Sequence, residues 1–418
     1  MTKSLDGKVS AHVKDTVNNL LKNDVVQKGM EFIKADHQHT VDEQIEITEI
    51  PAPPFKEHKR AEDLMRRLKE LNLQDVRMDE EGNVYGVRPG TGDGPKVFIS
   101  GHIDTVFPEG TDVTVKEKDG ILYAPGISDD TRGLAELLGV IRACNEADVK
   151  NIGDIVFGGT VGEEGAGDLR GVKAFFNENK DIDGFISIDG PTPDNIVYLG
   201  TGSYRYQVTY KGPGGHSFGA FGLPSAIHAL GRAIAGISDL ETPSEPKTTF
   251  TVGEITGGTS VNAIAYEASM KVDLRSNEKK ELDELAEQFL AIVKKAAEDE
   301  NKRWNTDEIT VEIEKFGDRP PAKQSHDDEI IQVAWTAIEA IGSKPVLDTP
   351  SSTDSNHPMS IGVPSITLGR GGKAGGAHSL DEWYDPTDAY IGVQKNFLTL
   401  LSLVGVEGVS EPLLSKKK

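Results

Sequence analysis

The chain has 418 residues, of which 37% are hydrophobic and 27% charged, and this size and composition predict a soluble globular protein of two domains. A net charge of −23 at pH 7 argues against nucleic acid or an anionic membrane as partner, because both repel an acidic surface. The single cysteine, Cys144, excludes a disulfide within the chain. Without an apolar signal region or a run of membrane-spanning length, the expected location is the cytoplasm.

The first part of the sequence alternates between helical and strand-like patterns. Helices are predicted at 10–35, 56–72 and 131–145, and buried strands at 96–100, 154–160 and 184–188. Strands separated by helices favour an α/β fold, with a mostly parallel sheet and helices on both of its faces. In such folds the functional site lies at the carboxyl ends of the strands.

The pattern changes between residues 203 and 317. Alternating strands are predicted at 204–211, 248–255, 265–275 and 308–316, and amphipathic helices at 224–240 and 278–300. Two helices on one face of a four-stranded antiparallel sheet would form an inserted α+β domain. The surrounding domain then comprises 1–202 and 318–418, with 318–321 as the returning linker.

Five residues of metal-binding type follow strand ends or glycine-rich turns of the surrounding domain. They are His102, Asp129, Glu164, Asp189 and His378. Two divalent ions about 3.5–4 Å apart can share one carboxylate and one water molecule. Such a centre needs two terminal histidines, a bridging carboxylate and one terminal carboxylate for each ion, which this set supplies. Imidazole and carboxylate ligands suit Zn²⁺, with Co²⁺ or Mn²⁺ as alternatives.

Two further acidic residues accompany these ligands. Glu163 adjoins Glu164 and cannot coordinate from the same direction, so it suits a general base that takes a proton from the attacking water. Asp104 lies two residues after His102, where its carboxylate can accept the second imidazole N–H and fix the tautomer. The alternative for the glutamate pair is a solvated surface pair, although an apolar strand precedes it.

Several motifs together resemble the cocatalytic zinc peptidase family that includes peptidase T, glutamate carboxypeptidase, carnosinase, aminoacylase and the succinyl-diaminopimelate desuccinylases. The motifs are His102-Ile103-Asp104, the segments 126–133 and 134–137, Glu163-Glu164, and His378-Ser379-Leu380-Asp381-Glu382. The resemblance covers nearly the whole chain and is nearest to peptidase T in detail. It implies that Asp129 rather than Asp130 bridges the ions, followed by a cis peptide bond. One departure is Thr131, since family members often carry lysine two residues after the bridging aspartate.

The resemblance also implies that the inserted domain is a lid and a surface for forming a homodimer. His216 would stabilise the oxyanion, Asn262 would orient the substrate, and Arg275 would clamp a free substrate carboxylate. The glycine-rich segment 369–376 would be a mobile loop beside the pocket. The residues alone are also consistent with a glycine-rich surface turn at His216 and an ordinary ion pair at Arg275.

The predicted activity is metal-dependent hydrolysis of an amide bond in a small peptide, as in a dipeptidase, tripeptidase or aminopeptidase. An N-acyl-amino-acid or N-carbamoyl amidohydrolase would use the same centre and is the nearer alternative. A noncatalytic binding protein is the remoter one, and loss of Glu163 or of a ligand would indicate it.

Overall fold

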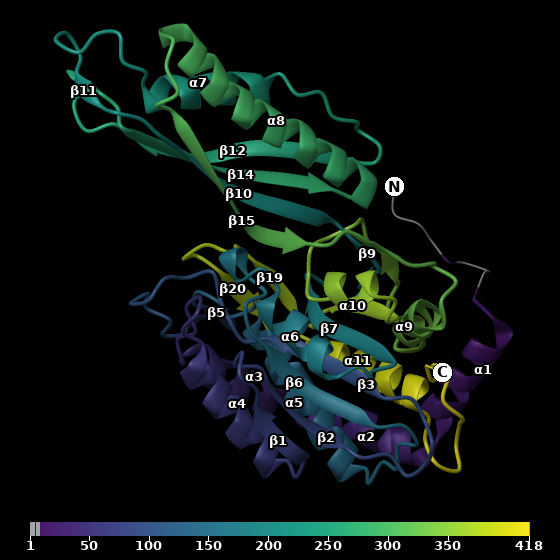
Figure 1. The fold of residues 1–418 in the computed structure, drawn as a ribbon. Helices are drawn as coiled ribbons and strands as arrows, with labels where there is room; N and C mark the ends of the chain where they lie inside the picture. Colours follow the sequence, from purple (N-terminus) through teal and green to yellow (C-terminus); the bar gives the residue numbers. More distant parts are fainter. Residues whose placement is uncertain (1–4, 6–8, 418) are drawn as a thin grey trace. The chain divides into compact units, whose positions relative to one another are not determined.

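The structure, a computed structural model, describes residue 5 and residues 9–417 (Figure 1). These residues form two compact units. The first unit comprises the described residues up to Gly200 and those from Lys323 onward, and the second unit comprises Thr201–Ala322. The second unit is therefore inserted into the chain of the first.

The first unit is built around an eight-stranded mixed sheet. In spatial order its strands are β1 (Gln74–Met78), β2 (Val84–Arg88), β6 (Ile155–Thr160), β3 (Val97–His102), β7 (Gly184–Gly190), β18 (Ser365–Gly369), β8 (Asn195–Val197) and β17 (Val346–Leu347). The central strands β6, β3, β7 and β18 are parallel to one another. The pairings β1–β2, β2–β6 and β18–β8 are antiparallel. The expected α/β fold is confirmed, with a parallel centre and antiparallel flanks.

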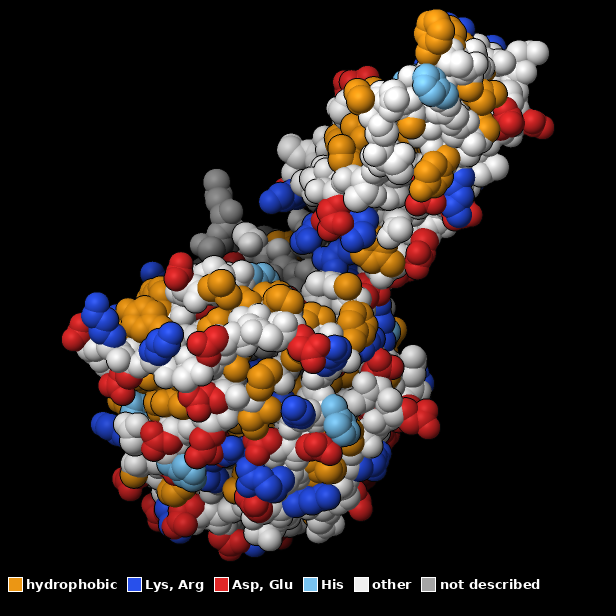
Figure 2. All heavy atoms as spheres, turned by 90° about the vertical axis from the view of Figure 1, so that its left-hand side faces the viewer, with side chains coloured by type: hydrophobic (Ala, Val, Ile, Leu, Met, Phe, Trp, Pro, Cys, Tyr) orange, Lys and Arg blue, Asp and Glu red, His pale blue; other side chains and the backbone are white. Residues whose placement is uncertain are grey.

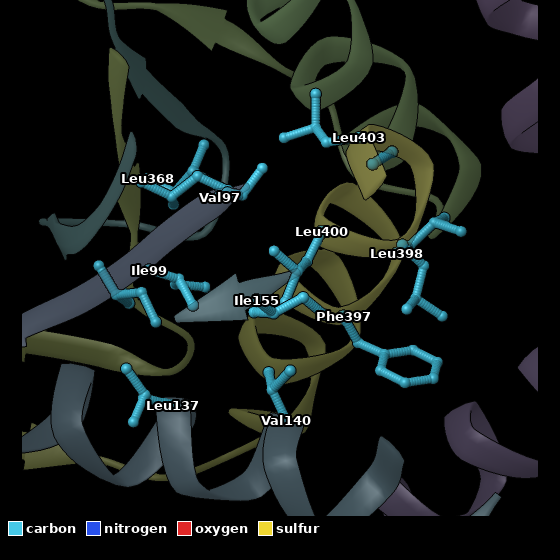
Figure 3. Close-up of a cluster of buried hydrophobic side chains, with 14 of the residues drawn as sticks. Val97, Ile99, Leu137, Val140, Ile155, Leu368, Phe397, Leu398, Leu400 and Leu403 are labelled. Carbon is cyan, nitrogen blue, oxygen red and sulfur yellow. The ribbon is translucent and has the colours of Figure 1, made fainter. Parts of the chain in front are cut away.

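Alternate side chains of the central strands enter two different cores. Val97 and Ile99 of β3 belong to the larger core, shown in Figure 3. Phe98 lies between them in sequence and belongs to a separate aromatic core, where its ring stacks on Phe175 at 4.0 Å between centroids. Successive residues of a strand point to opposite faces. Both faces of the sheet are therefore covered, as the apolar strand sequences predict.

Helices cover both faces of this sheet. They are α1 (Ala11–Lys22), α2 (Asp24–Ala35), α3 (His37–Thr48), α4 (His58–Glu70), α5 (Thr131–Glu146), α6 (Arg170–Glu178), α9 (Glu329–Ala340), α10 (Asn356–Ser360) and α11 (Tyr390–Val404), with a 3₁₀ turn at Gly165–Gly167. Helices α5 and α11 contribute to the larger core and α6 to the aromatic core. Within the described residues, no helix combines the length and apolar composition that crossing a bilayer requires.

A second, smaller sheet of the first unit brings together segments far apart in the sequence. Its order is β19 (Lys373–Gly375), β20 (Trp383–Asp385), β5 (Ile121–Tyr123) and β4 (Lys116–Lys118). Trp383 of β20 pairs with Tyr123 of β5 in antiparallel register. This pairing sets the segment after β5 beside the turn between β19 and β20.

The second unit has the predicted α+β composition. Its antiparallel sheet has the order β12 (Thr248–Gly257), β14 (Glu267–Ser276), β10 (Gly202–Lys211) and β15 (Thr310–Arg319). Helices α7 (Ala226–Ser238) and α8 (Lys279–Trp304) share one core with alternate residues of β10, so both cover the same face (Figure 1). A separate pair of short strands, β11 (Gly215–His216) and β13 (Ala263–Ile264), completes the unit.

Four sequence-based expectations differ from the structure in detail. The helix expected over 10–35 is divided at Asn23 into α1 and α2, because the Asn23 side chain caps the start of α2. The expected boundaries after residues 202 and 317 fall inside β10 and β15, because each strand continues to the edge of its unit. Asp318 and Arg319 belong to β15 rather than to a linker. Within the segment 369–376, expected as a loop, Gly369 ends β18 and Lys373–Gly375 form β19, which pairs with β20. The local sequence pattern does not reveal this partner strand. Short β9 (Leu199–Gly200) and β16 (Ala322–Lys323) lie where the chain leaves and re-enters the first unit.

Candidate metal centre

His102 ends the buried strand β3, at the carboxyl end of the parallel centre of the sheet. Its Nδ1–H donates to the main-chain oxygen of Asp104 at 2.9 Å. Its Nε2 lies 3.2 Å from Oδ1 of Asp129. A neutral imidazole protonated on Nδ1 has its lone pair on Nε2, so this ring presents a ligand nitrogen to the carboxylate cluster.

The Asp104 carboxylate holds the glutamate pair rather than the His102 ring. Its two oxygens accept the main-chain N–H groups of Glu163 at 3.1 Å and Glu164 at 2.9 Å. Its Oδ1 is 3.7 Å from His102 Nδ1, which is too long for a hydrogen bond. The tautomer of His102 is thus fixed by the Asp104 carbonyl, while the carboxylate fixes the turn carrying two buried glutamates.

Asp129 and Asp130 have different surroundings although they are adjacent. The Oδ1 of Asp129 faces His102, and its Oδ2 lies 3.2 Å from Nε2 of His378. Asp130 accepts the main-chain N–H groups of His102 at 2.9 Å and Gly133 at 3.2 Å, and so caps the start of α5. The peptide bond between the two aspartates is cis. Only Asp129 directs one oxygen at each imidazole, which is the arrangement that a bridging ligand requires.

His378 reaches the cluster through the smaller sheet. It lies in the turn between β19 and β20 with a φ of 65°, and the pairing of β20 with β5 brings this turn to Asp129. Its Nε2 is 2.8 Å from Oε1 of Glu164. Hydrogen bonds to Asp129 and Glu164 raise the pKa of His378 to about 10.

Asp189 lies near the end of β7, with Oδ1 3.8 Å from Nε2 of His102. Burial raises the pKa of Asp189 to about 7, and the neighbouring carboxylates of Asp129 and Glu164 add to this rise. Among the described residues, three sets of side chains have possible ligand atoms within 4.8 Å of one another: His102 with Glu163 and Glu164, His102 with Asp130 and Asp189, and Asp129 with Glu164 and His378. The fold therefore gathers all five predicted ligands, and this set of nitrogen and oxygen donors fits divalent cations such as zinc.

Two residues of the cluster have roles that the sequence did not indicate. Glu382 is buried and accepts the main-chain N–H groups of Gly126, Ser128 and Asp129 at 2.8–3.0 Å. The guanidinium of Arg370 is buried against the aspartates. Glu382 belongs to a family motif, and Arg370 interrupts a glycine-rich segment directly after an apolar strand. The local sequence contains no other feature that points to a role for Glu382 or Arg370.

The second unit contains His216, Asn262 and Arg275. The Nδ1 of His216 accepts the main-chain N–H groups of Phe218 at 3.2 Å and Gly219 at 3.3 Å. A neutral His216 ring is therefore protonated on Nε2 and can donate a hydrogen bond from there. Asn262 is its neighbour, because its main-chain oxygen accepts the N–H of Ser217 at 2.9 Å.

Arg275 lies near the other end of β14 from this turn. Its Nε donates to Oδ2 of Asp273 at 2.6 Å, and Arg205 contacts the same carboxylate at 3.2 Å. The side chain of Arg275 remains 43% exposed. In this structure Arg275 thus forms the ordinary ion pair, and a substrate carboxylate would have to compete with Asp273.

An α/β unit with two imidazoles and several carboxylates gathered at the carboxyl ends of parallel strands is the architecture of a metal-dependent hydrolase. The chain belongs to peptidase family M20/M25/M40, whose family model matches residues 98–401. The resemblance inferred from its motifs is thereby confirmed, and the protein is a peptidase or amidohydrolase of this family.

Three relatives are distant in sequence, but each match covers most of this chain. Succinyl-diaminopimelate desuccinylase of Corynebacterium glutamicum is 25% identical over 345 residues, which is 80% of this chain and 89% of the relative. The crystal structure of the aminopeptidase PepT from Bacillus cereus matches with a TM-score of 0.71 and 23% identity, covering 87% of this chain and 97% of that one. The YXEP protein of Bacillus subtilis, described as a dinuclear metal-binding peptidase, matches with a TM-score of 0.66 and 18% identity, over 89% and 99%.

Proposed function

We propose that this protein hydrolyses an amide bond in a small peptide, using two divalent ions, with zinc the expected metal. The observation that carries the proposal is the carboxylate of Asp129, whose oxygens each lie 3.2 Å from a different imidazole. In this proposal His102 and Asp189 hold one ion, and Glu164 and His378 hold the other. The likeness to a PepT aminopeptidase and to a dinuclear metal-binding peptidase supports this assignment.

The ions, when bound, supply a nucleophilic water at neutral pH and polarise the carbonyl of the substrate. Glu163 takes the proton of the attacking water and passes it to the leaving amine. Its carboxylate is buried beside Glu164 and His102. Its main chain is held by Asp104, so the base has a fixed position before substrate binds.

The test of this mechanism is Glu163→Gln, which removes the base and keeps the shape of the side chain. We expect turnover to fall about 10²- to 10⁴-fold while metal content stays at two ions per chain. Glu178→Gln, at an exposed glutamate of α6, is the matched control and should behave as the wild type. Turnover close to the wild-type value in Glu163→Gln would remove the assigned base.

For the second unit we propose that His216 donates from Nε2 to the oxyanion, and that Asn262 and Arg275 orient the substrate. The tautomer imposed on His216 by Phe218 and Gly219 supports the first role. For Arg275, the side chain's partial exposure supports access by a substrate carboxylate.

The variant Arg275→Ala tests the proposed clamp. It should raise KM more for peptides with a free carboxylate than for the amidated peptides, because only the former lose an ion pair. Arg205→Ala, which removes the other arginine paired with Asp273, is the control. Equal changes in KM for both kinds of peptide would count against the clamp.

The second candidate is hydrolysis of an N-acyl amino acid, favoured by the likeness to a desuccinylase over 80% of the chain. Assaying the metal-loaded protein against dipeptides, tripeptides and N-acyl or N-carbamoyl amino acids separates the two candidates. A kcat/KM higher for the acylated substrates by about tenfold or more would reverse our preference.

We further propose a homodimer formed through the second unit. Of the ten large hydrophobic side chains that the described residues expose, six belong to this unit, although it is the smaller one. They are Phe218, Phe221, Ile227, Ile255, Val261 and Tyr266. Figure 2 shows hydrophobic side chains among polar ones on one face of this unit. Strand β12 is an edge strand of its sheet and could pair with a second copy.

We assign the protein to the cytoplasm because its single cysteine is buried and free, which suits a reducing compartment. Cell fractionation tests this assignment, and recovery in a secreted fraction would contradict it.

A further inference from the structure

Arg370 places a permanent positive charge among the acidic residues of the candidate metal centre. Its Nη1 lies 2.7 Å from the main-chain oxygen of Ser128, 3.1 Å from Oδ1 of Asp129 and 3.1 Å from Oδ1 of Asp130. The same nitrogen is 3.6 Å from Oδ1 of Asp189. Only 8% of the residue is exposed. One guanidinium thus contacts three carboxylates, of which two are proposed metal ligands.

The main chain on both sides of Arg370 is held from neighbouring elements. The N–H of Gly371 donates to Glu136 of α5 at 2.5 Å, and its carbonyl accepts from Tyr384 at 2.8 Å. The carbonyl of Gly369 accepts from the buried amino group of Lys395. A Cβ on Gly369 would lie 1.4 Å from a main-chain oxygen, so the chain passes here only as glycine. Arg370 is therefore set in place by the fold.

The contacts of Arg370 are not shared equally between the two proposed ion positions. It contacts Oδ1 of Asp129, the oxygen that faces His102, and lies close to Asp189. Oδ2 of Asp129 instead faces His378, which is hydrogen-bonded to Glu164. A cation on the His102 side would share its carboxylate oxygens with a guanidinium of like charge. Like charges repel most strongly in a buried environment, where screening by water and salt is weak.

We propose that Arg370 makes the two ion positions unequal, so that the position held by His102 and Asp189 binds a divalent cation more weakly than the position held by Glu164 and His378. Arg370 is a positioning residue: it fixes the aspartates before ions arrive and lowers the affinity of one position. The proposal rests on the dinuclear centre proposed above. When the metal concentration is too low to fill both positions, the protein would hold one ion, at the tighter position. Activity would then depend on how far the weaker position is filled.

The direct experiment titrates metal-free protein with Co²⁺ in a calorimeter, which measures binding without any substrate. The wild type should bind two ions in separate steps, with dissociation constants that differ by about tenfold or more. In Arg370→Met the dissociation constant of the weaker step should fall, so that the two constants become similar. Arg370→Lys keeps the positive charge, so its two dissociation constants should remain as different as in the wild type.

The matched control is Arg142→Met. Arg142 is equally buried and is paired with Asp36 and Glu43, neither of which belongs to the metal centre. This variant should keep the wild-type separation of the two steps. Equal affinities in the wild type, or an unchanged separation in a folded Arg370→Met, would overturn the proposal.

A second measurement identifies the weaker position without altering Arg370. Asp189→Ala should abolish the weak step and leave the tight one, whereas His378→Ala should abolish the tight step. The reverse assignment would overturn the inference. If the wild type bound no Co²⁺ at all, the proposed function itself would fail, whereas two equal ions in an active enzyme would refute only the role of Arg370.

Discussion

His378 contacts two carboxylates through a single imidazole nitrogen, and this geometry links metal binding to pH. Hydrogen bonds to Asp129 and Glu164 raise its pKa to about 10, so in the metal-free protein the ring is protonated at neutral pH. A histidine that binds a metal must give up this proton. The raised pKa stabilises the metal-free fold fully below the ordinary value of about 6.5, and this contribution is lost as the pH rises through about 10.

We therefore expect ion affinity to increase with pH between about 6.5 and 10, with a proton released on binding. Calorimetric titration in buffers of different ionisation enthalpy measures that proton. The variant His378→Gln should lose one binding step and the part of the pH dependence that belongs to His378; the rest remains, because the surrounding carboxylates also raise the pKa of His102. Wild-type affinity that stays constant over this range would show that His378 is not a ligand.

Among the helices and strands, the long helices are predictable from the sequence, whereas the shortest strands are not. The helices over 131–145 and 278–300 carry enough apolar periodicity to identify α5 and α8 within a few residues. Strands β19 and β20 have only three residues each, and β20 also pairs with β5, more than 200 residues earlier in the chain. Local pattern contains no information about such a partner, so 369–376 was expected to be a loop.

The β20–β5 pairing makes Glu382 a structural clamp for the loop that carries Asp129. Its carboxylate accepts three main-chain N–H groups, including that of Asp129 itself. Glu382→Gln replaces one accepting oxygen by a donor, so at least one N–H loses its partner. We expect metal affinity to fall about 10- to 100-fold, as for other groups that orient ligands.

Asp381→Asn changes the adjacent, exposed carboxylate and serves as the control for Glu382. It should leave the affinity near the wild-type value. Equal losses in the two variants would mean that charge near the site, rather than the orientation of the loop, determines metal binding.

For the whole molecule, the sequence predicted two domains because their patterns differ, and each unit has its own core. The five residues predicted as ligands also lie close together, since the ends of parallel strands converge, and their role as ligands is our proposal. Arg370 could not be identified in this way. Its contact with Asp129 spans 241 residues, and its importance comes from the charges around it rather than from a motif.

Light scattering after size-exclusion chromatography tests the proposed dimer, because it measures the mass of the protein in solution. The chain has a mass of 45.1 kDa, and we expect the wild type to elute with twice that mass. Ile255→Glu places a charge on the edge strand β12 and should produce monomers, because burying an unpaired charge is costly. Ile361→Glu, at an exposed position of the first unit, should remain dimeric. A monomeric wild type would contradict the proposal.

We propose that two divalent ions are held together by His102, Asp129, Glu164, Asp189 and His378. Anomalous diffraction at the zinc absorption edge, from crystals grown with zinc, tests it most directly. We expect two strong peaks among these side chains, with Asp129 between them. Peaks elsewhere, or no peak at this cluster in a protein that hydrolyses peptides, would contradict it.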